Sequence, residues 1–356
     1  MLTERENALR NYDFEGPEWI PTNVGISPAT WHKYREELER VLVQHPFACG
    51  AFEPGSVDFD NFPPGYREGE RYTDMWQCVW ENAQGGLEGI VTVNPLADWD
   101  ALDSFTPPDP LKVHERGERE SWDEFARHVE ETRRREQAVW LWVDRTFERL
   151  HFLRGYENLM VDFMTGEPKL GALIDMVVEH NLRLVEKLAE FKPDVIGFGD
   201  DLGTQQALMM SPAIFKKYLA PAYKRQFEAA KKTGARVFLH SDGCILEAIP
   251  MLIDCGLDIV NPQIAANTVE GLRRVVKGKL AIHLDLDRQH VLPWGTPRQV
   301  RAHIIEAVDA LGDPSGGLGL SAEFQPTVPL CNIAATLQTF EEVMYRYSAR
   351  GGSCCR

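Results

Sequence analysis

Hydrophobic and polar positions follow a regular rhythm from about residue 190 onward. Short apolar runs, typical of buried strands, alternate with longer stretches in which apolar residues recur at helical spacing. The predicted strands span residues 194–198, 236–239, 257–260, 280–284 and 317–321. The helices predicted after them are one capped by Ser211 and Pro212 and ended by Gly234, a stretch through Leu246–Ile253, and helices near 269–276, 297–311 and 333–347.

This alternation predicts an α/β fold with parallel strands, because each helix must return the chain to the same end of the sheet. Five strand–helix units of this length fit a (β/α)8 TIM barrel. The alternative is a doubly wound open sheet, but the glycine fingerprint of a dinucleotide-binding fold follows none of the strands. We therefore expect one barrel domain over residues 1–356.

The first 150 residues are less regular and predict an irregular N-terminal part with a helical insertion. Residues 20–26 and 87–93 are candidate strands, whereas 61–69 and 106–110 are rich in loop-forming residues. Residues 116–149 are highly charged, and their periodicity predicts a pair of solvated helices. Regular units are expected over 151–347, followed by a flexible tail at 348–356 that carries Cys354 and Cys355.

The amino-acid composition limits the binding partners and the location that we expect. The formal net charge of −16 is unfavourable for binding nucleic acid or an anionic membrane surface. The charged start MLTERENALR lacks the apolar core of a signal peptide, and no stretch approaches the ~18 apolar residues of a membrane helix, so a cytoplasmic location is expected. Seven scattered cysteines indicate reduced thiols rather than a disulfide framework.

Polar residues lie at or near the carboxyl end of every predicted strand. Such ends converge on one mouth of a barrel, where barrel enzymes keep their chemistry. Each single acid has an alternative role as a helix cap, and His240 as a core histidine, but the whole set favours a site. The candidates, in chain order, are Asp200, Asp201, Gln205, His240, Asp242, Asn261, Gln263, His283, Asp285, Asp287 and Glu323.

Three of these residues are candidate metal ligands. His240, Asp242 and Glu323 offer one imidazole and two carboxylates to a divalent ion, with a position left open for substrate. Asp200 and Asp201 are candidates for substrate binding or general acid catalysis, with capping as the alternative. Cys244 is expected to be a small buried residue rather than a ligand.

Several spaced motifs resemble those of one known family, the uroporphyrinogen decarboxylase superfamily, and most closely its branch of cobalamin-dependent methyltransferases. The resemblance covers about residues 150–347, and pieces near 76–100 and 152–164 are also similar. The family fold is a (β/α)8 barrel. The motifs are DDLGTQ (200–205), MSPAIFKKYLAPAYK (210–224), GARVFLHSDG (234–243), LDIVNPQ (257–263) and LDRQHVLPWGTP (286–297).

The resemblance implies methyl transfer between a small methoxy or alcohol substrate and a corrinoid. In the methyltransferase branch zinc is held by His-x-Cys and a later Cys; here His240 keeps the histidine, while Asp242 and Glu323 stand at or near the cysteine positions. This exchange makes a harder site, suited to zinc or another divalent ion and to an oxygen substrate. Asn261, Gln263, His283, Asp285 and Gln205 are then expected to contact substrate.

The corrinoid is expected on a separate partner protein, because the chain has no Asp-x-His-x-x-Gly segment. A homodimer is possible in this family.

The first alternative to methyl transfer is a uroporphyrinogen decarboxylase-type lyase that uses carboxylate and histidine acid–base chemistry. It is disfavoured because residues 18–27 lack the family's propionate-binding arginines. The second alternative is a binding protein without catalysis on the same barrel.

Overall fold

The computed structural model describes residues 1–63 and 65–347, so the tail predicted at 348–356, with Cys354 and Cys355, lies outside the described residues. The chain divides into two compact units. The first unit combines residues 1–63, 85–87 and 260 onward, and the second combines residues 65–84 and 88–259. The first unit therefore joins the two ends of the chain, whereas the second is built from its middle.

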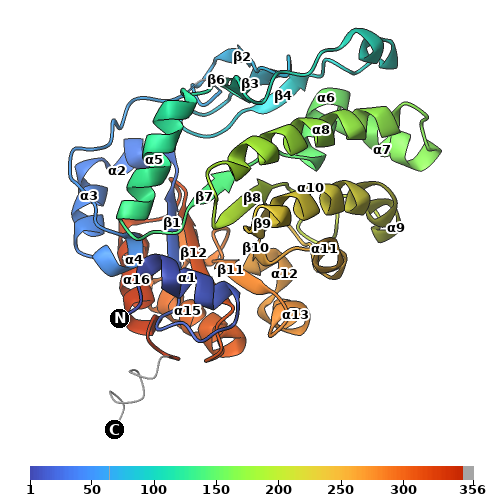
Figure 1. Ribbon diagram of the computed structural model, residues 1–356. Helices are drawn as coiled ribbons and strands as arrows, with labels where there is room; N and C mark the ends of the chain where they lie inside the picture. Colours follow the sequence, from blue (N-terminus) through green and yellow to red (C-terminus); the bar gives the residue numbers. More distant parts are fainter. Residues whose placement is uncertain (64, 348–356) are drawn as a thin grey trace. The chain divides into compact units, whose positions relative to one another are not determined.

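The first unit contains four parallel strands and their helices. Their order is β1-β12-β11-β10, and β12 pairs in parallel with both β1 and β11 (Figure 1). In chain order the elements are α1 (Glu4–Tyr12), β1 (Thr22–Ile26), α2 (Pro28–Tyr34), α3 (Glu36–Val43), α4 (Pro46–Cys49), β10 (Ile259–Pro262), α12 (Ile264–Asn267), α13 (Val269–Val276), β11 (Ala281–Asp285), α14 (Val291–Trp294), α15 (Pro297–Leu311), β12 (Leu318–Phe324) and α16 (Leu330–Val343).

The second unit contains the parallel strands in the order β7-β8-β9, with small antiparallel sheets before them. Its elements are β2 (Arg71–Thr73), β3 (Val79–Glu81), β4 (Ile90–Val93), the 3-10 helix η1 (Trp99–Ser104), β5 (Val113–His114), β6 (Gly117–Glu118), α5 (Trp122–Arg134), β7 (Trp140–Trp142), α6 (Phe147–Arg154), α7 (Tyr156–Thr165), α8 (Leu170–Ala189), β8 (Val195–Gly199), α9 (Pro212–Ile214), the π-helical turn η2 (Phe215–Leu219), α10 (Ala220–Lys232), β9 (Arg236–Ser241) and α11 (Ile249–Cys255).

Helices cover one face of β8 and β9. Phe198 of β8 is buried against Phe227 of α10, with ring centroids 5.1 Å apart, and α10 lies alongside α8 (Figure 1). Side chains alternate between the two faces of a strand. Gly197, Gly199, Phe238 and His240 therefore belong to the opposite face, the one without these helices.

The predicted α/β class with parallel strands and alternating helices is confirmed, and the described residues contribute seven such strands. The helix pair predicted at 116–149 is wrong. Within this range α5 is helical and α6 begins at Phe147, but residues 140–142 between them form β7, a strand of the parallel sheet. Val139, Leu141 and Val143 are buried with the period of two that a strand requires, and the dense charges of α5 obscured this short pattern.

Two smaller differences affect the site. Strand β12 continues to Phe324, so Glu323 lies inside the strand rather than after it. The helix expected through Leu246 begins only at Ile249. Among the described residues, every helix is too short or too polar to cross a membrane.

Candidate functional site

The carboxyl ends of β8 and β9 bring three of the predicted residues together. Gly199 of β8 is paired with His240 of β9, so the residues that follow both strands emerge at the same edge. Asp201 follows β8 and Asp242 follows β9. The local sequence produces this arrangement because each apolar run stops one residue before the polar group appears.

Asp201, His240 and Asp242 form what we call the Asp–His–Asp cluster. Nε2 of His240 lies 3.2 Å from Oδ1 of Asp242 and 4.0 Å from Oδ1 of Asp201. The backbone N–H of Asp242 donates to Oδ1 of Asp201 at 3.0 Å, which ties the two loops together. One possible ligand atom from each residue lies within 4.8 Å of the others, and the side chains are 30–39% exposed.

The electrostatics of the cluster suit a cation. Burial raises the pKa of Asp201, and the nearby charge of Asp242 raises it further. A divalent ion between the carboxylates would offset that repulsion and would accept the imidazole nitrogen as a third ligand. The donor set, one nitrogen and two carboxylate oxygens with a partly exposed side, fits zinc or a comparable divalent ion with a position left for substrate.

Two glycines allow the loops carrying Asp201 and Asp242 to touch. A Cβ on Gly243, whose φ is +76°, would overlap the carbonyl of Gly203, and a Cβ on Gly203 would lie 2.5 Å from the backbone nitrogen of Cys244. The close approach lets Cys244 N–H donate to the carbonyl of Thr204 at 2.7 Å. The two loops are therefore held in one arrangement by backbone contacts, which fixes the cluster's geometry.

Asp200 has a different environment from its neighbour. It is 1% exposed, and its two oxygens accept hydrogen bonds from the backbone N–H groups of Thr146, Phe147 and Glu148, at 2.8–2.9 Å, and from the Tyr223 hydroxyl at 2.7 Å. The three backbone donors are the first N–H groups of α6, so Asp200 caps that helix. Burial raises its pKa to about 6 despite these bonds. The contacts favour the capping alternative, and its catalytic role stays a prediction.

Glu148 of α6 connects the cluster to the interior. Its Oε2 accepts the backbone N–H of Asp201 at 3.2 Å, and its Oε1 accepts Arg145 Nη1 at 2.9 Å. Burial raises the pKa of Glu148 to about 8, with Arg145 opposing the shift and Asp201 and Asp200 adding to it. Sequence reasoning missed Arg145 and Glu148, because residues 116–149 were interpreted as a solvated segment.

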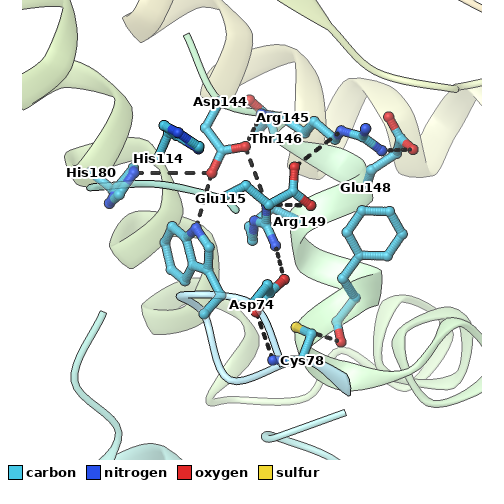
Figure 2. A network of polar contacts seen from close by, with 12 residues as sticks. Asp74, Cys78, His114, Glu115, Asp144, Arg145, Thr146, Glu148, Arg149 and His180 are labelled. Atoms are coloured by element: carbon cyan, nitrogen blue, oxygen red, sulfur yellow. Dashed lines mark hydrogen bonds and ion pairs between the residues drawn. The ribbon is translucent and has the colours of Figure 1, made fainter. Parts of the chain in front are cut away.

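Behind Glu148 lies a buried network of ion pairs around Arg149, which Figure 2 shows from close by. The Arg149 guanidinium lies 3.4 Å from Asp74, 3.2 Å from Glu115 and 3.2 Å from Asp144, and its side chain is 0% exposed. Two of these carboxylates also accept hydrogen bonds from tryptophan N–H groups: Trp76 donates to Asp144 at 3.0 Å, and Trp80 donates to Asp74 at 2.9 Å. The network anchors α6 and with it the residues that hold Asp200 and Asp201.

Glu148 predicts a measurable dependence of stability on pH. A carboxyl whose pKa rises from 4.5 to about 8 on folding keeps its proton only in the folded state between these values, so the free energy of unfolding falls as pH rises through that window. In metal-free protein, Glu148→Gln should reduce the fall between pH 5 and pH 8 by on the order of a few kcal/mol. Denaturant unfolding at both pH values measures it; an unchanged difference, matching the exposed control Glu131→Gln, would contradict it.

The first unit holds the other predicted residues except Gln205, which belongs to the second unit. Asn261 donates to the backbone carbonyl of His283 at 2.6 Å, and the Tyr12 hydroxyl lies 3.0 Å from Nε2 of His283. Burial lowers the pKa of His283 to about 4, so this histidine is neutral at physiological pH. Gln263 is buried and forms a parallel bridge with Asp285. These four residues are thus brought together on β10 and β11, while Gln205 is exposed in the loop after β8.

Glu323 already forms an ion pair with an arginine side chain. Arg288 forms an ion pair with Glu323 and lies 3.4 Å from Oδ2 of Asp285, and Gln325 donates to the other oxygen of Glu323. Asp287 caps the turn that positions Arg288, by accepting the N–H groups of Gln289 and His290. Glu323 as a metal ligand stays a prediction, and Asp201 is the acid that the second unit places beside His240 and Asp242.

Parallel strands alternating with helices define an α/β protein of the barrel type, and the candidate site residues lie at or near the ends of its strands. The chain belongs to the uroporphyrinogen decarboxylase (URO-D) family, whose model matches residues 147–343. That segment includes the Asp–His–Asp cluster, Glu148 and Glu323. The resemblance expected from the sequence motifs is thereby confirmed.

A solved methyltransferase structure supports the fold. A methyltransferase from Methanosarcina mazei is similar over 96% of this chain and 99% of its own, with a TM-score of 0.64 and 16% identity. An L-ribulose 3-epimerase is similar over 65% of this chain and 84% of its own, with a TM-score of 0.42 and 14% identity. No curated protein matches the sequence.

Proposed function

We propose that this chain is a URO-D-like methyltransferase that moves a methyl group between a small methoxy or alcohol substrate and a corrinoid. The observation that carries the proposal is the Asp–His–Asp cluster at the carboxyl ends of adjacent parallel strands. The similarity to the Methanosarcina mazei methyltransferase supports the fold on which such a reaction would run. The corrinoid belongs to a partner protein and acts as a second substrate.

The ion in this proposal is divalent, zinc first. His240 and Asp242 keep the ligand roles expected from the sequence, and Asp201 joins them. Glu323 remains a proposed further ligand, whose carboxylate would have to leave Arg288 before it could bind the ion. When bound, the ion acts as a Lewis acid on the substrate oxygen.

The residues of the chain have distinct tasks. His240 and Asp242 orient one another through their 3.2 Å contact, and Asp201 is held by Glu148 from its backbone side and by Asp242 from its carboxylate side. In the transfer, the methyl carbon–oxygen bond breaks and its electron pair stays on oxygen, which takes up a proton. The reduced cobalt(I) corrinoid, as second substrate, would supply the electron pair of the new bond to the methyl carbon, and solvent would supply the proton.

Metal analysis of the purified wild type and of His240→Ala tests the proposal. We expect about one divalent ion per chain in the wild type and its loss in the variant, because an imidazole and two carboxylates form the site. The matched control is His128→Ala, since His128 is an exposed histidine of α5 that pairs with Glu120, and its replacement should not change the metal content. Methyl transfer from methoxy compounds to reduced free cobalamin should be lost together with the metal.

Absence of a divalent ion from both proteins would overturn the metal site. His240 and Asp242 would then act as an acid–base pair, and a lyase of the decarboxylase type would become the better proposal. Full metal content together with no methyl transfer to free cobalamin would instead contradict the corrinoid reaction and keep the site.

A further inference from the structure

The backbone N–H of Asp201 points in a different direction from those of its neighbours in the loop after β8. The neighbouring N–H groups donate to β9 or to the residue that follows it, at 3.0–3.2 Å. These bonds join Asp200 to the His240 carbonyl, Leu202 to the Ser241 hydroxyl and Gly203 to the Asp242 carbonyl. The Asp201 N–H donates instead to Oε2 of Glu148 in α6, at 3.2 Å. Within residues 200–203, the peptide of Asp201 is therefore the one oriented from the α6 side.

Glu148 can hold this peptide only while its carboxylate keeps one orientation. Its other oxygen, Oε1, accepts Nη1 of Arg145 at 2.9 Å (Figure 2). A carboxylate that accepts one donor on each oxygen cannot turn away without breaking these hydrogen bonds. The side chain of Glu148 is only 12% exposed, so water has little access to replace either donor. Arg145 therefore fixes the oxygen that faces Asp201.

The guanidinium of Arg145 is itself fixed by two further acids. Its Nη2 lies 3.1 Å from both oxygens of Glu88, and its Nε lies 3.9 Å from Oε2 of Glu115. Because a guanidinium is planar and its donors have fixed directions, contacts on two edges determine where the third donor points. The contacts thus run in the order Glu88, Arg145, Glu148 and Asp201, and all four residues belong to the second unit.

We propose that Arg145 is a positioning residue, which acts through Glu148 to set the direction of the Asp201 carboxylate. By this route it controls how tightly the Asp–His–Asp cluster binds its ion. The inference rests on the metal site of the proposed function and adds residues outside the cluster on which that site depends. Residues that only orient a metal ligand change metal affinity by ~10–100-fold when they are removed.

Binding of Co²⁺ to the metal-free protein tests the role of Arg145 without any turnover. The d–d absorption of bound Co²⁺ depends on the number and arrangement of its ligands. We expect Arg145→Met to weaken Co²⁺ binding at least about tenfold and to alter this spectrum. Arg145→Lys should stay within about threefold of the wild type, because an ammonium can still donate to Oε1 of Glu148. Unchanged affinity and spectrum in Arg145→Met would overturn the proposal.

The matched control is Arg225→Met. Arg225 also joins two carboxylates of the second unit, those of Asp175 and Glu179, but it does so on the exposed surface of α8 and α10. Its replacement removes a comparable set of ion pairs without a contact to the loop of Asp201. Co²⁺ affinity and spectrum should therefore match those of the wild type. A loss equal to that of Arg145→Met would show that any such ion pair has this effect, and would reject the proposed route.

A double-mutant cycle separates positioning through Glu148 from a general loss of packing. In Glu148→Gln an NH2 group must face either Arg145 or the Asp201 N–H, so Co²⁺ binding should weaken. Adding Arg145→Met to Glu148→Gln should cost less than about twofold more, because the amide oxygen is then free to accept the Asp201 N–H. Equal costs of Arg145→Met in both backgrounds would contradict the route through Glu148. If Arg145→Met does not fold, Glu88→Gln loosens the same guanidinium and takes its place in the cycle.

The metal site and the positioning role fail in different ways. Wild type that binds no Co²⁺, or His240→Ala that binds it as tightly as the wild type, would reject the site and the positioning role with it. Co²⁺ binding that requires His240 but is unaffected by Arg145→Met would keep the site and reject the role of Arg145. Weakened binding in Arg145→Met, near-normal binding in Arg145→Lys and a non-additive cycle are the results that we expect.

Discussion

Arg149→Met is expected to lower the free energy of unfolding by about 3–5 kcal/mol, because it leaves buried carboxylates without their cation. Arg149 has no exposed side-chain surface and lies within 3.4 Å of Asp74 and 3.2 Å of Glu115 and Asp144 (Figure 2). Methionine preserves most of the side-chain volume, so the effect reports the lost charge rather than a cavity. The carboxylates would have to take up protons or admit water.

Urea unfolding of wild type and variants at pH 7 measures this effect. Arg135→Met is the matched control, since Arg135 pairs with Glu131 on the exposed surface of α5 and should contribute only ~0.3–0.5 kcal/mol. Arg149→Lys should fall between the two, because one ammonium cannot reach three carboxylates as the guanidinium does. A loss below about 1 kcal/mol in Arg149→Met would show that the network is not important for stability.

The regular half of the fold was predictable because its signals are local. Buried parallel strands appear in the sequence as short apolar runs. The start of the helical segment formed by α9, η2 and α10 is indicated by Ser211, an N-cap residue whose side chain accepts the N–H of Ile214. Strand β7 was not predictable in the same way. It has only three residues, and its alternation is embedded between the charges of α5 and those of α6.

Other features that the sequence did not predict depend on contacts between residues far apart in the chain. In the first unit β1 runs beside β12, with Thr22 opposite Leu320, although about 300 residues separate them. No local pattern reveals such a partner. The same limit applies to Arg149, whose carboxylate partners come from segments as distant as Asp74, and to Glu323, whose partner Arg288 belongs to another loop.

The candidate site shows what a sequence can and cannot assign. The positions of Asp200, Asp201, His240 and Asp242 at strand ends were predictable, because apolar runs end there and parallel strands share an edge. The separate roles of Asp200 and Asp201 were not predictable, because each role depends on the direction in which the carboxylate points. The N-terminus of α6, more than fifty residues earlier, decides it by engaging Asp200 and leaving Asp201 beside His240.

Asp200→Asn and Asp201→Asn should therefore have opposite effects although the residues are neighbours. In Asp200→Asn an amide NH2 would face N–H donors of α6 or the Tyr223 hydroxyl, and each unsatisfied buried group costs about 1–3 kcal/mol. Metal content in the protein that still folds should remain at the wild-type level. Calorimetric or urea unfolding, together with metal analysis of the same samples, records both quantities.

In Asp201→Asn the stability should change by less than about 0.5 kcal/mol, because the side chain is partly exposed and an amide oxygen can still accept the Asp242 N–H. Metal affinity should fall by more than about 100-fold, since removal of a group that only supports a ligand already costs ~10–100-fold. If Asp200→Asn loses the ion and Asp201→Asn keeps it, the assignment of the two acids is reversed. Loss of the ion in both variants would mean that the α6 cap and the cluster form one cooperative structure, in which Glu148 transmits the change from one acid to the other.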